Sequence, residues 1–222
     1  MLIYIPDDYS NFMEVKNGGI GDGILYRSSS PLKGGAEKKL KAELALKAGI
    51  KCIINLDDSG SVINELSKDI PWYHELVLQG NVICLPMSFT IPGIASNEKK
   101  LKTALQFMAS REGPYLIHCF AGVDRTGFFS ALLQALMGAG LKEICKNYLS
   151  AFPFDNTDSF RIQKFSKMKG FLKQIKTMCR GKKITGVDIQ AASEEYLLNN
   201  IGLSVEEIAK LKYLLTAPAS IL

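Results

Sequence analysis

The sequence has 222 residues, of which 47% are hydrophobic, and this is enough for one sizeable domain with its own core. It has no run of about 18 apolar residues and no basic start followed by an apolar segment, so neither a transmembrane helix nor a secretory signal is predicted. The net charge is only +5. The five cysteines form no Cys-x-x-Cys pair, which argues against a disulfide framework or a structural zinc site. The two histidines are too few for histidine-rich metal chemistry.

Four apolar runs predict the strands of a sheet. Three of them are apolar throughout, at residues 52–56 (CIINL), 82–87 (VICLPM) and 115–119 (YLIHC). Such strands are typical of a sheet that is covered on both faces. The fourth run, residues 23–28 (GILYRS), predicts an edge strand.

Helical patterns separate these strands. Residues 36–48 are rich in Ala, Leu, Lys and Glu and stop at Gly49, and residues 98–111 follow a Ser96-Asn97 cap and stop before Pro114. The alternation of strand and helix predicts an α/β fold with a central, mostly parallel sheet flanked by helices.

Beyond Thr126 the sequence predicts helices alone. Their expected ranges are 127–137, 141–149, 159–179, 188–199 and, after a capping box of Ser204 and Glu207, about 205–215. There is no internal repeat and no long linker, so we expect one domain over residues 1–222, with residues 141–222 forming a helical C-terminal cap within it.

Positive charge is concentrated in residues 161–183, which hold nine Lys and Arg and no acid. Removing these nine from the 27 basic residues leaves 18, against 22 acidic residues. Three interpretations stay open: a solvated face over a packed stripe, a lid that guides anionic substrates, or an amphipathic helix that binds an anionic membrane surface. We predict no nucleic-acid partner.

The stretch HCFAGVDRTG, residues 118–127, joins the third apolar strand to the following helix. Between them, the backbone N–H groups of residues 120–125 can form an anion-binding nest at the positive end of the helix dipole. Gly122 permits the tight curvature of such a loop. The pattern therefore predicts a phosphate site made by Phe120, Ala121, Gly122, Val123, Asp124 and Arg125.

Cysteine chemistry fits this loop. A helix N-terminus favours the thiolate form, which makes Cys119 the expected nucleophile. Arg125 offers a planar fork for two phosphoryl oxygens. Thr126 can donate a hydrogen bond to the sulfur, and His118 can order the loop. No metal or organic cofactor is needed for this chemistry.

The motif Cys-x5-Arg-Thr after an apolar strand resembles the phosphate loop of the cysteine-dependent phosphatases. The full loop resembles the bacterial tyrosine/lipid phosphatases of the protein-tyrosine phosphatase B type, as do LYRSSSPL, LKAGIKCIINLDD and ASEEYLLNNIGLSVEEIAKLKYLL. The resemblance covers most of residues 23–215, with 57–80 and 151–185 poorly matched. It implies hydrolysis of phosphotyrosine, with phosphoserine and phosphothreonine as further substrates, through a phosphocysteine, and phosphorylated proteins as partners.

The chain departs from that pattern at two places. Val123 stands where the branch commonly has a lysine associated with phosphoinositide substrates, and Asn55-Leu56-Asp57 replaces the family's Asp-Leu-Arg. Because Val123 removes a positive charge expected over the mouth of the site, phosphotyrosine is the preferred substrate. Arg27, in the segment that resembles the family's Tyr-Arg-Ser, either braces the site or forms a plain strand salt bridge.

The general acid is the least defined role. Residues 88–96 (SFTIPGIAS), where many relatives carry the acid, contain none. Asp124 is the first choice, since it lies in the loop beside the reacting phosphate. Asp57 and Asp58 are second choices because they follow a strand end.

Rival functions stay open at this stage. They are a phosphoinositide phosphatase, a pseudophosphatase that binds phosphorylated ligands without turnover, and a sulfur or arsenate redox enzyme. The redox reading is disfavoured because no other cysteine lies within 25 residues of Cys119. The unpaired cysteines indicate a reducing, cytoplasmic location, with export that needs no N-terminal signal as the alternative.

Overall fold

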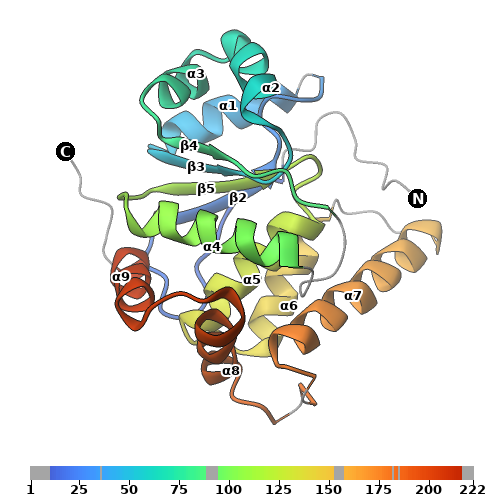
Figure 1. Cartoon of the computed structure of the whole chain (residues 1–222). Coiled ribbons are helices and arrows are strands. Elements are labelled where there is room, and N and C mark those ends of the chain that lie inside the picture. The colour runs from blue at the N-terminus through green and yellow to red at the C-terminus, as the bar shows by residue number, and fades with distance from the viewer. Residues whose placement is uncertain are drawn as a thin grey trace.

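A central five-stranded sheet organises the computed structural model, which describes residues 11–35, 37–88, 95–152, 158–181, 183–184 and 186–216. The strand order is β1-β2-β5-β3-β4 (Figure 1). The strands are β1 (Met13–Glu14), β2 (Leu25–Ser29), β3 (Cys52–Asn55), β4 (Val82–Cys84) and β5 (Tyr115–Cys119). β1 is antiparallel to β2 and all the other pairs are parallel, so β2 to β5 end at one edge of the sheet. The predicted α/β fold is confirmed.

The fourth predicted strand is correct in position but wrong as an edge strand. β2 lies between β5 and β1, because Met13 pairs with Arg27 and Glu14 with Tyr26. The edge strands are β1 and β4. β1 has only two residues, too few to give a sequence pattern.

Helices cover both faces of the sheet (Figure 1). On one face lie α1 (Glu37–Lys47), α2 (Gly60–Leu66), the 3-10 turn η1 (Ser67–Asp69) and α3 (Pro71–Leu78). Ile53 and Leu116 point to that face, whereas their neighbours Ile54 and Ile117 point to the other core. Successive strand residues face opposite sides of a sheet, and here both sides are buried, which explains the continuous apolar runs.

The second face carries the remaining helices. They are α4 (Ala95–Ala109), α5 (Asp124–Leu136), α6 (Leu141–Ser150), α7 (Asp158–Met178), α8 (Ile189–Tyr196), the π-helical turn η2 (Leu197–Ile201) and α9 (Val205–Thr216). The predicted capping box of α9 is present, since Ser204 Oγ accepts from Glu207 N at 3.2 Å and Glu207 accepts from Ser204 N at 2.8 Å. The helix predicted over 188–199 ends earlier and continues as η2.

α5 is the buried axis of this layer. Every residue from Thr126 to Leu136 is buried, as its all-round apolar sequence predicts. α6, α7 and α8 contact it, so the segment that follows the loop at 118–127 is held rigidly. The description of residues 1–222 as one domain, with residues 141–222 as its helical cap, stays a prediction. Within the described ranges, every helix is too short or too polar to cross a lipid bilayer.

Candidate active site

The loop between β5 and α5 lies at the edge where the parallel strands end. β5 ends at Cys119 and α5 begins at Asp124, so only four residues connect them. Gly122 has φ +68°, and a Cβ atom there would lie 2.4 Å from the Ser28 carbonyl carbon and from Ser29 N. No side chain fits at that distance, which accounts for the glycine.

The backbone of this loop forms a cluster of available donors. Among the described residues, no acceptor meets the N–H groups of residues 120–124. They precede the first turn of α5, so the positive end of the helix dipole adds to them. Such an arrangement is suited to an anion with several oxygens, as the sequence predicts.

Arg27 braces the outside of the loop. Its guanidinium is fully buried and donates to Gly122 O at 2.8 Å and to Asn147 Oδ1, on α6, at 2.8 Å. Asn11 makes a second hydrogen bond to the loop backbone, since its Nδ2 donates to Ala121 O at 2.9 Å. With these carbonyls held from outside, the loop is fixed before any ligand binds, and the bracing interpretation of Arg27 is the one that the geometry supports.

His118 and Cys119 end β5 in the interior. Cys119 is a free thiol that is 1% exposed. Burial lowers the pKa of His118 to about 3, so the ring is neutral, and its Nε2 lies 2.9 Å from Tyr73 Oη. Tyr73 comes from α3, a helix that no sequence pattern predicts. This hydrogen bond fixes the start of the loop to the opposite helical layer.

Arg125 is held at the same edge of the sheet. Its Nη1 lies 2.9 Å from Asp57 Oδ1 and donates to Leu56 O at 2.9 Å and to Met87 O at 3.3 Å. The side chain is 8% exposed. The guanidinium is therefore anchored by groups that follow β3 and β4.

Asp57 and Asp58 form a compact turn under Lys33. Burial raises the pKa of Asp57, but Lys33 Nζ at 2.7 Å and Arg125 outweigh it, so the pKa lies below its ordinary value. Lys33 also pairs with Asp58, which is buried. Asn55 Oδ1 accepts from the N–H groups of Asp57 at 2.8 Å and Asp58 at 3.0 Å, as a carboxylate could, but its Nδ2 also donates to Asp58 Oδ2 at 3.4 Å, which a carboxylate could not do. An ionised Asp57 is a poor general acid.

Asp124 lies beside the loop but already has partners. One oxygen pairs with Lys167 of α7, and the other accepts from Tyr148 Oη at 3.2 Å. Tyr148 in turn stacks on Phe171 with ring centroids 3.9 Å apart. The basic segment therefore reaches the loop through Lys167, and Asp124 can donate a proton only after that ion pair is released.

The three other predicted residues, Val123, Thr126 and Phe120, lie in different environments. Val123 is 1% exposed and packs in the main core, so the expectation that its side chain lies over the mouth of the site is wrong. The Thr126 hydroxyl is buried and has no hydrogen-bond partner among the described residues, so its expected bond to the Cys119 sulfur is not formed in this structure. Phe120 is 53% exposed, and Lys33 Nζ lies 5.7 Å from its ring centroid.

The sequence matches the model of the tyrosine phosphatase family over residues 8–217. The protein belongs to the tyrosine phosphatase family. Membership makes it a phosphatase of the cysteine-dependent type, as the loop motif predicts. Comparison with curated proteins gave no match.

Solved structures similar to this tyrosine phosphatase family member include two named proteins. TpbA of P. aeruginosa is 19% identical, with 83% of this chain and 91% of that chain covered and a TM-score of 0.48. The core catalytic domain of the PP-IP phosphatase SIW14 of S. cerevisiae, in complex with citrate, is 24% identical, with 73% and 94% covered and a TM-score of 0.43. A TpbA variant in complex with pTyr is 16% identical, with 85% and 96% covered and a TM-score of 0.38.

The candidate site at the loop 118–127 of this phosphatase thus contains residues of two kinds. The predicted group, from His118 to Thr126, is local in sequence. The residues that the sequence did not indicate come from other elements: Asn11, Lys33, Tyr73, Asn147, Tyr148 and Lys167. Of these six residues, only Lys167 lies in a segment with a notable sequence pattern, the basic segment 161–183.

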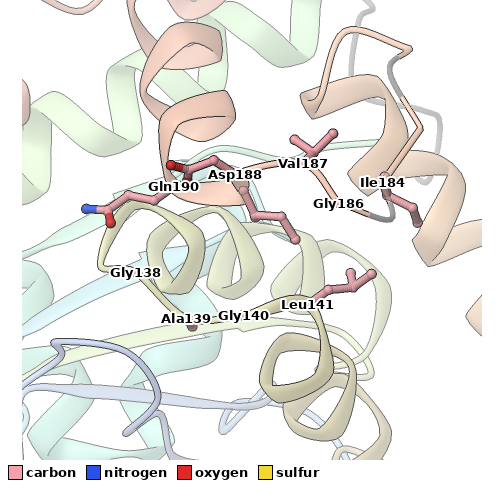
Figure 2. A pocket seen from close by; sticks show the side chains of 10 residues that line it. Gly138, Ala139, Gly140, Leu141, Ile184, Gly186, Val187, Asp188 and Gln190 are labelled. Carbon is pink, nitrogen blue, oxygen red and sulfur yellow. The ribbon is translucent and has the colours of Figure 1, made fainter.

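Two further observations concern parts of the molecule outside the loop at 118–127. No cluster of three metal-binding His, Cys, Asp or Glu side chains occurs in the described part of the chain. A cavity of about 480 Å³ lies between the turn before α6 and the start of α8, where Leu141, Ile184 and Val187 line it (Figure 2). None of its lining residues belongs to the loop at 118–127.

Proposed function

We propose that this protein hydrolyses phosphotyrosine in phosphorylated proteins, with phosphoserine and phosphothreonine as further substrates, through a phosphocysteine at Cys119. One observation carries the proposal. Cys119 ends β5 directly beneath a loop whose N–H groups meet no acceptor among the described residues, at the N-terminus of the buried helix α5. A phosphate bound there lies beside the thiol.

In the first step the Cys119 thiolate attacks phosphorus in line with the tyrosine oxygen. The S–P bond forms, the P–O bond breaks, and the leaving oxygen takes a proton from Asp124. The loop N–H groups and Arg125 bind the equatorial oxygens as charge builds up on them. Arg27 and Asp57 position this machinery without touching substrate.

In the second step water attacks the phosphocysteine. The P–O bond to water forms, the S–P bond breaks, and the thiolate is regenerated with release of inorganic phosphate. The Thr126 hydroxyl, which is buried and unoccupied among the described residues, donates to the sulfur as it leaves. Asp124, now ionised, takes the proton from water.

Asp124 is proposed as the acid because Asp57 is held ionised by Lys33 and Arg125. The Lys167 ion pair must open before Asp124 can carry a proton. A phosphate dianion in the loop attracts the Lys167 ammonium, so substrate binding itself weakens that pair. Lys167 then contacts substrate while Asp124 becomes available.

The surroundings of the loop favour an aromatic ester. Phe120 is exposed at the mouth and can stack on the ring of phosphotyrosine. A second candidate is a phosphoinositide, because Lys33 and Lys167 lie on two sides of the loop and can meet additional phosphates. The buried Val123 supports neither choice.

Hydrolysis of p-nitrophenyl phosphate, with and without chelator, tests the activity. Equal turnover under both conditions is expected, while no release of nitrophenol would indicate a pseudophosphatase or redox enzyme. A panel of phosphotyrosine peptides, phosphoserine peptides and phosphoinositides then tests the substrate. A higher kcat/KM for any phosphoinositide than for every phosphopeptide would replace the first candidate with the second.

A further inference from the structure

Helix α7 has two faces with different environments. It runs along the outside of the helical layer, with its first turns at the margin of the molecule (Figure 1). Phe171, Ile175 and Met178 are buried in the main core. The side chains that point away from the core, three or four residues apart, are those of Ile162, Phe165, Lys169, Lys173 and Lys176, which we term the outward face of α7.

The first turns of the outward face are apolar. Ile162 is 69% exposed and Phe165 is 64% exposed, and Lys169 Nζ lies 4.8 Å from the Phe165 ring centroid. Two large apolar side chains one turn apart thus keep most of their surface exposed to solvent. They are available to an apolar layer outside the protein.

The following turns of the outward face are cationic. Lys169, Lys173 and Lys176 are exposed, and none has a carboxylate partner within the described residues. Like charges three or four residues apart destabilise a helix. This row of lysines belongs to the segment 161–183, which contains no acid, whereas the rest of the chain has more acidic than basic residues. The charge is thus directed to one surface.

We infer that the outward face of α7 docks on an anionic lipid bilayer, with Ile162 and Phe165 in the headgroup layer and the three lysines against lipid phosphates. Three features favour a bilayer over an acidic protein. The face is a straight row on a helix and so matches a flat surface. It combines apolar and basic groups, as interfacial helices do. Its cations are lysines, whose compact charge suits a diffuse negative surface, whereas arginine forks suit individual carboxylates.

Docking in this way connects to the phosphate loop. Lys167 lies on the opposite side of α7 and pairs with Asp124 at the start of α5. The helix that meets the lipid surface therefore also contacts the loop, so a docked protein holds its phosphate site near the bilayer. Docking itself requires no catalytic activity.

Co-sedimentation of the full chain with phosphatidylcholine vesicles, with and without phosphatidylserine, tests this inference. We expect binding only to the vesicles that contain phosphatidylserine, and weaker binding at high salt. Lys169→Gln with Lys173→Gln should lower the partition coefficient about 25-fold, at about fivefold for each lysine. Ile162→Ser with Phe165→Ser should lower it roughly tenfold through lost apolar contact.

Matched controls come from α1, which also exposes lysines and a leucine. Lys39→Gln with Lys47→Gln, and Leu46→Ser (64% exposed), should leave vesicle binding unchanged. Equal binding to both kinds of vesicle, equal losses in the α1 variants, or binding to polyglutamate or duplex DNA but not to vesicles would overturn the inference. The assay measures binding alone, so a wild type that fails to hydrolyse p-nitrophenyl phosphate would contradict the proposed function and leave this result intact.

Discussion

Arg125 and Asp57 form an ion pair at the edge of the sheet, with Nη1 and Oδ1 2.9 Å apart. Asp57 stands where the family pattern has an arginine, so this chain places a carboxylate against the guanidinium that we propose binds phosphate. The pair also includes Lys33, which is 2.7 Å from the other oxygen of Asp57. Arg125 is thus pre-positioned by an anion that the neighbouring lysine keeps charged.

If Asp57 positions Arg125, Asp57→Asn should lower kcat/KM for p-nitrophenyl phosphate by about 10- to 100-fold, the scale of one charge-assisted hydrogen bond. The loss should appear in kcat, because Arg125 acts on the transition state. Glu65→Gln, which removes the exposed partner of Lys68, is the matched control and should be neutral. Unchanged kcat in Asp57→Asn would show that the backbone carbonyls alone hold Arg125.

Asp124→Asn should slow substrates with poor leaving groups by roughly 10²–10⁴, because their leaving oxygen needs a proton. The loss on p-nitrophenyl phosphate, whose leaving group barely needs one, should be much smaller. Steady-state rates on a series of aryl phosphates give the comparison. Equal losses across the series would assign Asp124 a structural role with Lys167 and Tyr148, and the same dependence in Asp58→Asn instead would move the acid to the turn after β3.

Gly122→Ala should abolish the phosphate site, because the new Cβ would lie 2.4 Å from backbone atoms of Ser28 and Ser29. Gly49→Ala is a matched control. Gly49 has a similar φ of +63° but no atom within 4 Å of an added Cβ, so it isolates the cost of the backbone conformation, about 1–2 kcal/mol. Urea unfolding should show a larger loss for Gly122→Ala, and equal losses would mean that the loop can shift away from β2.

Stability should depend on pH through His118. The pKa of about 3 lies below the ordinary value near 6.5, so the unfolded chain binds a proton more readily than the folded chain. The contribution of neutral His118 is complete above about pH 6.5 and is lost as the pH falls toward 3. His118→Gln should flatten the curve of unfolding free energy over that window. Parallel curves for the wild type and His118→Gln would contradict the burial argument.

Local patterns account for what the sequence could predict. The loop at 118–127 is continuous, so its cysteine, glycine and arginine indicate the proposed phosphate site without tertiary information. The buried strands are recognisable because helices cover both faces of the sheet. α2 and α3 were missed because each is at most eight residues long, too short for a periodic signal.

Contacts between distant segments could not be predicted in the same way. Tyr73 reaches His118 from 45 positions away, and Lys167 reaches Asp124 from 43 positions away. Only the packing of α3 and α7 brings these residues to the loop. Val123 shows a different kind of error, because its place inside the loop motif suggested a side chain at the mouth of the site, whereas the side chain is buried in the core.

The central claim is that phosphate becomes covalently bound to Cys119 during turnover. Acid quenching of the enzyme during hydrolysis of p-nitrophenyl phosphate tests this claim most directly. The phosphocysteine mechanism predicts that peptide mapping of the wild type finds phosphate on Cys119. It also predicts that Cys119→Ser has neither the phosphopeptide nor turnover, while Cys145→Ser, at a free cysteine on α6, keeps both. Phosphate on another residue, or substantial nitrophenol release by Cys119→Ser, would contradict the mechanism.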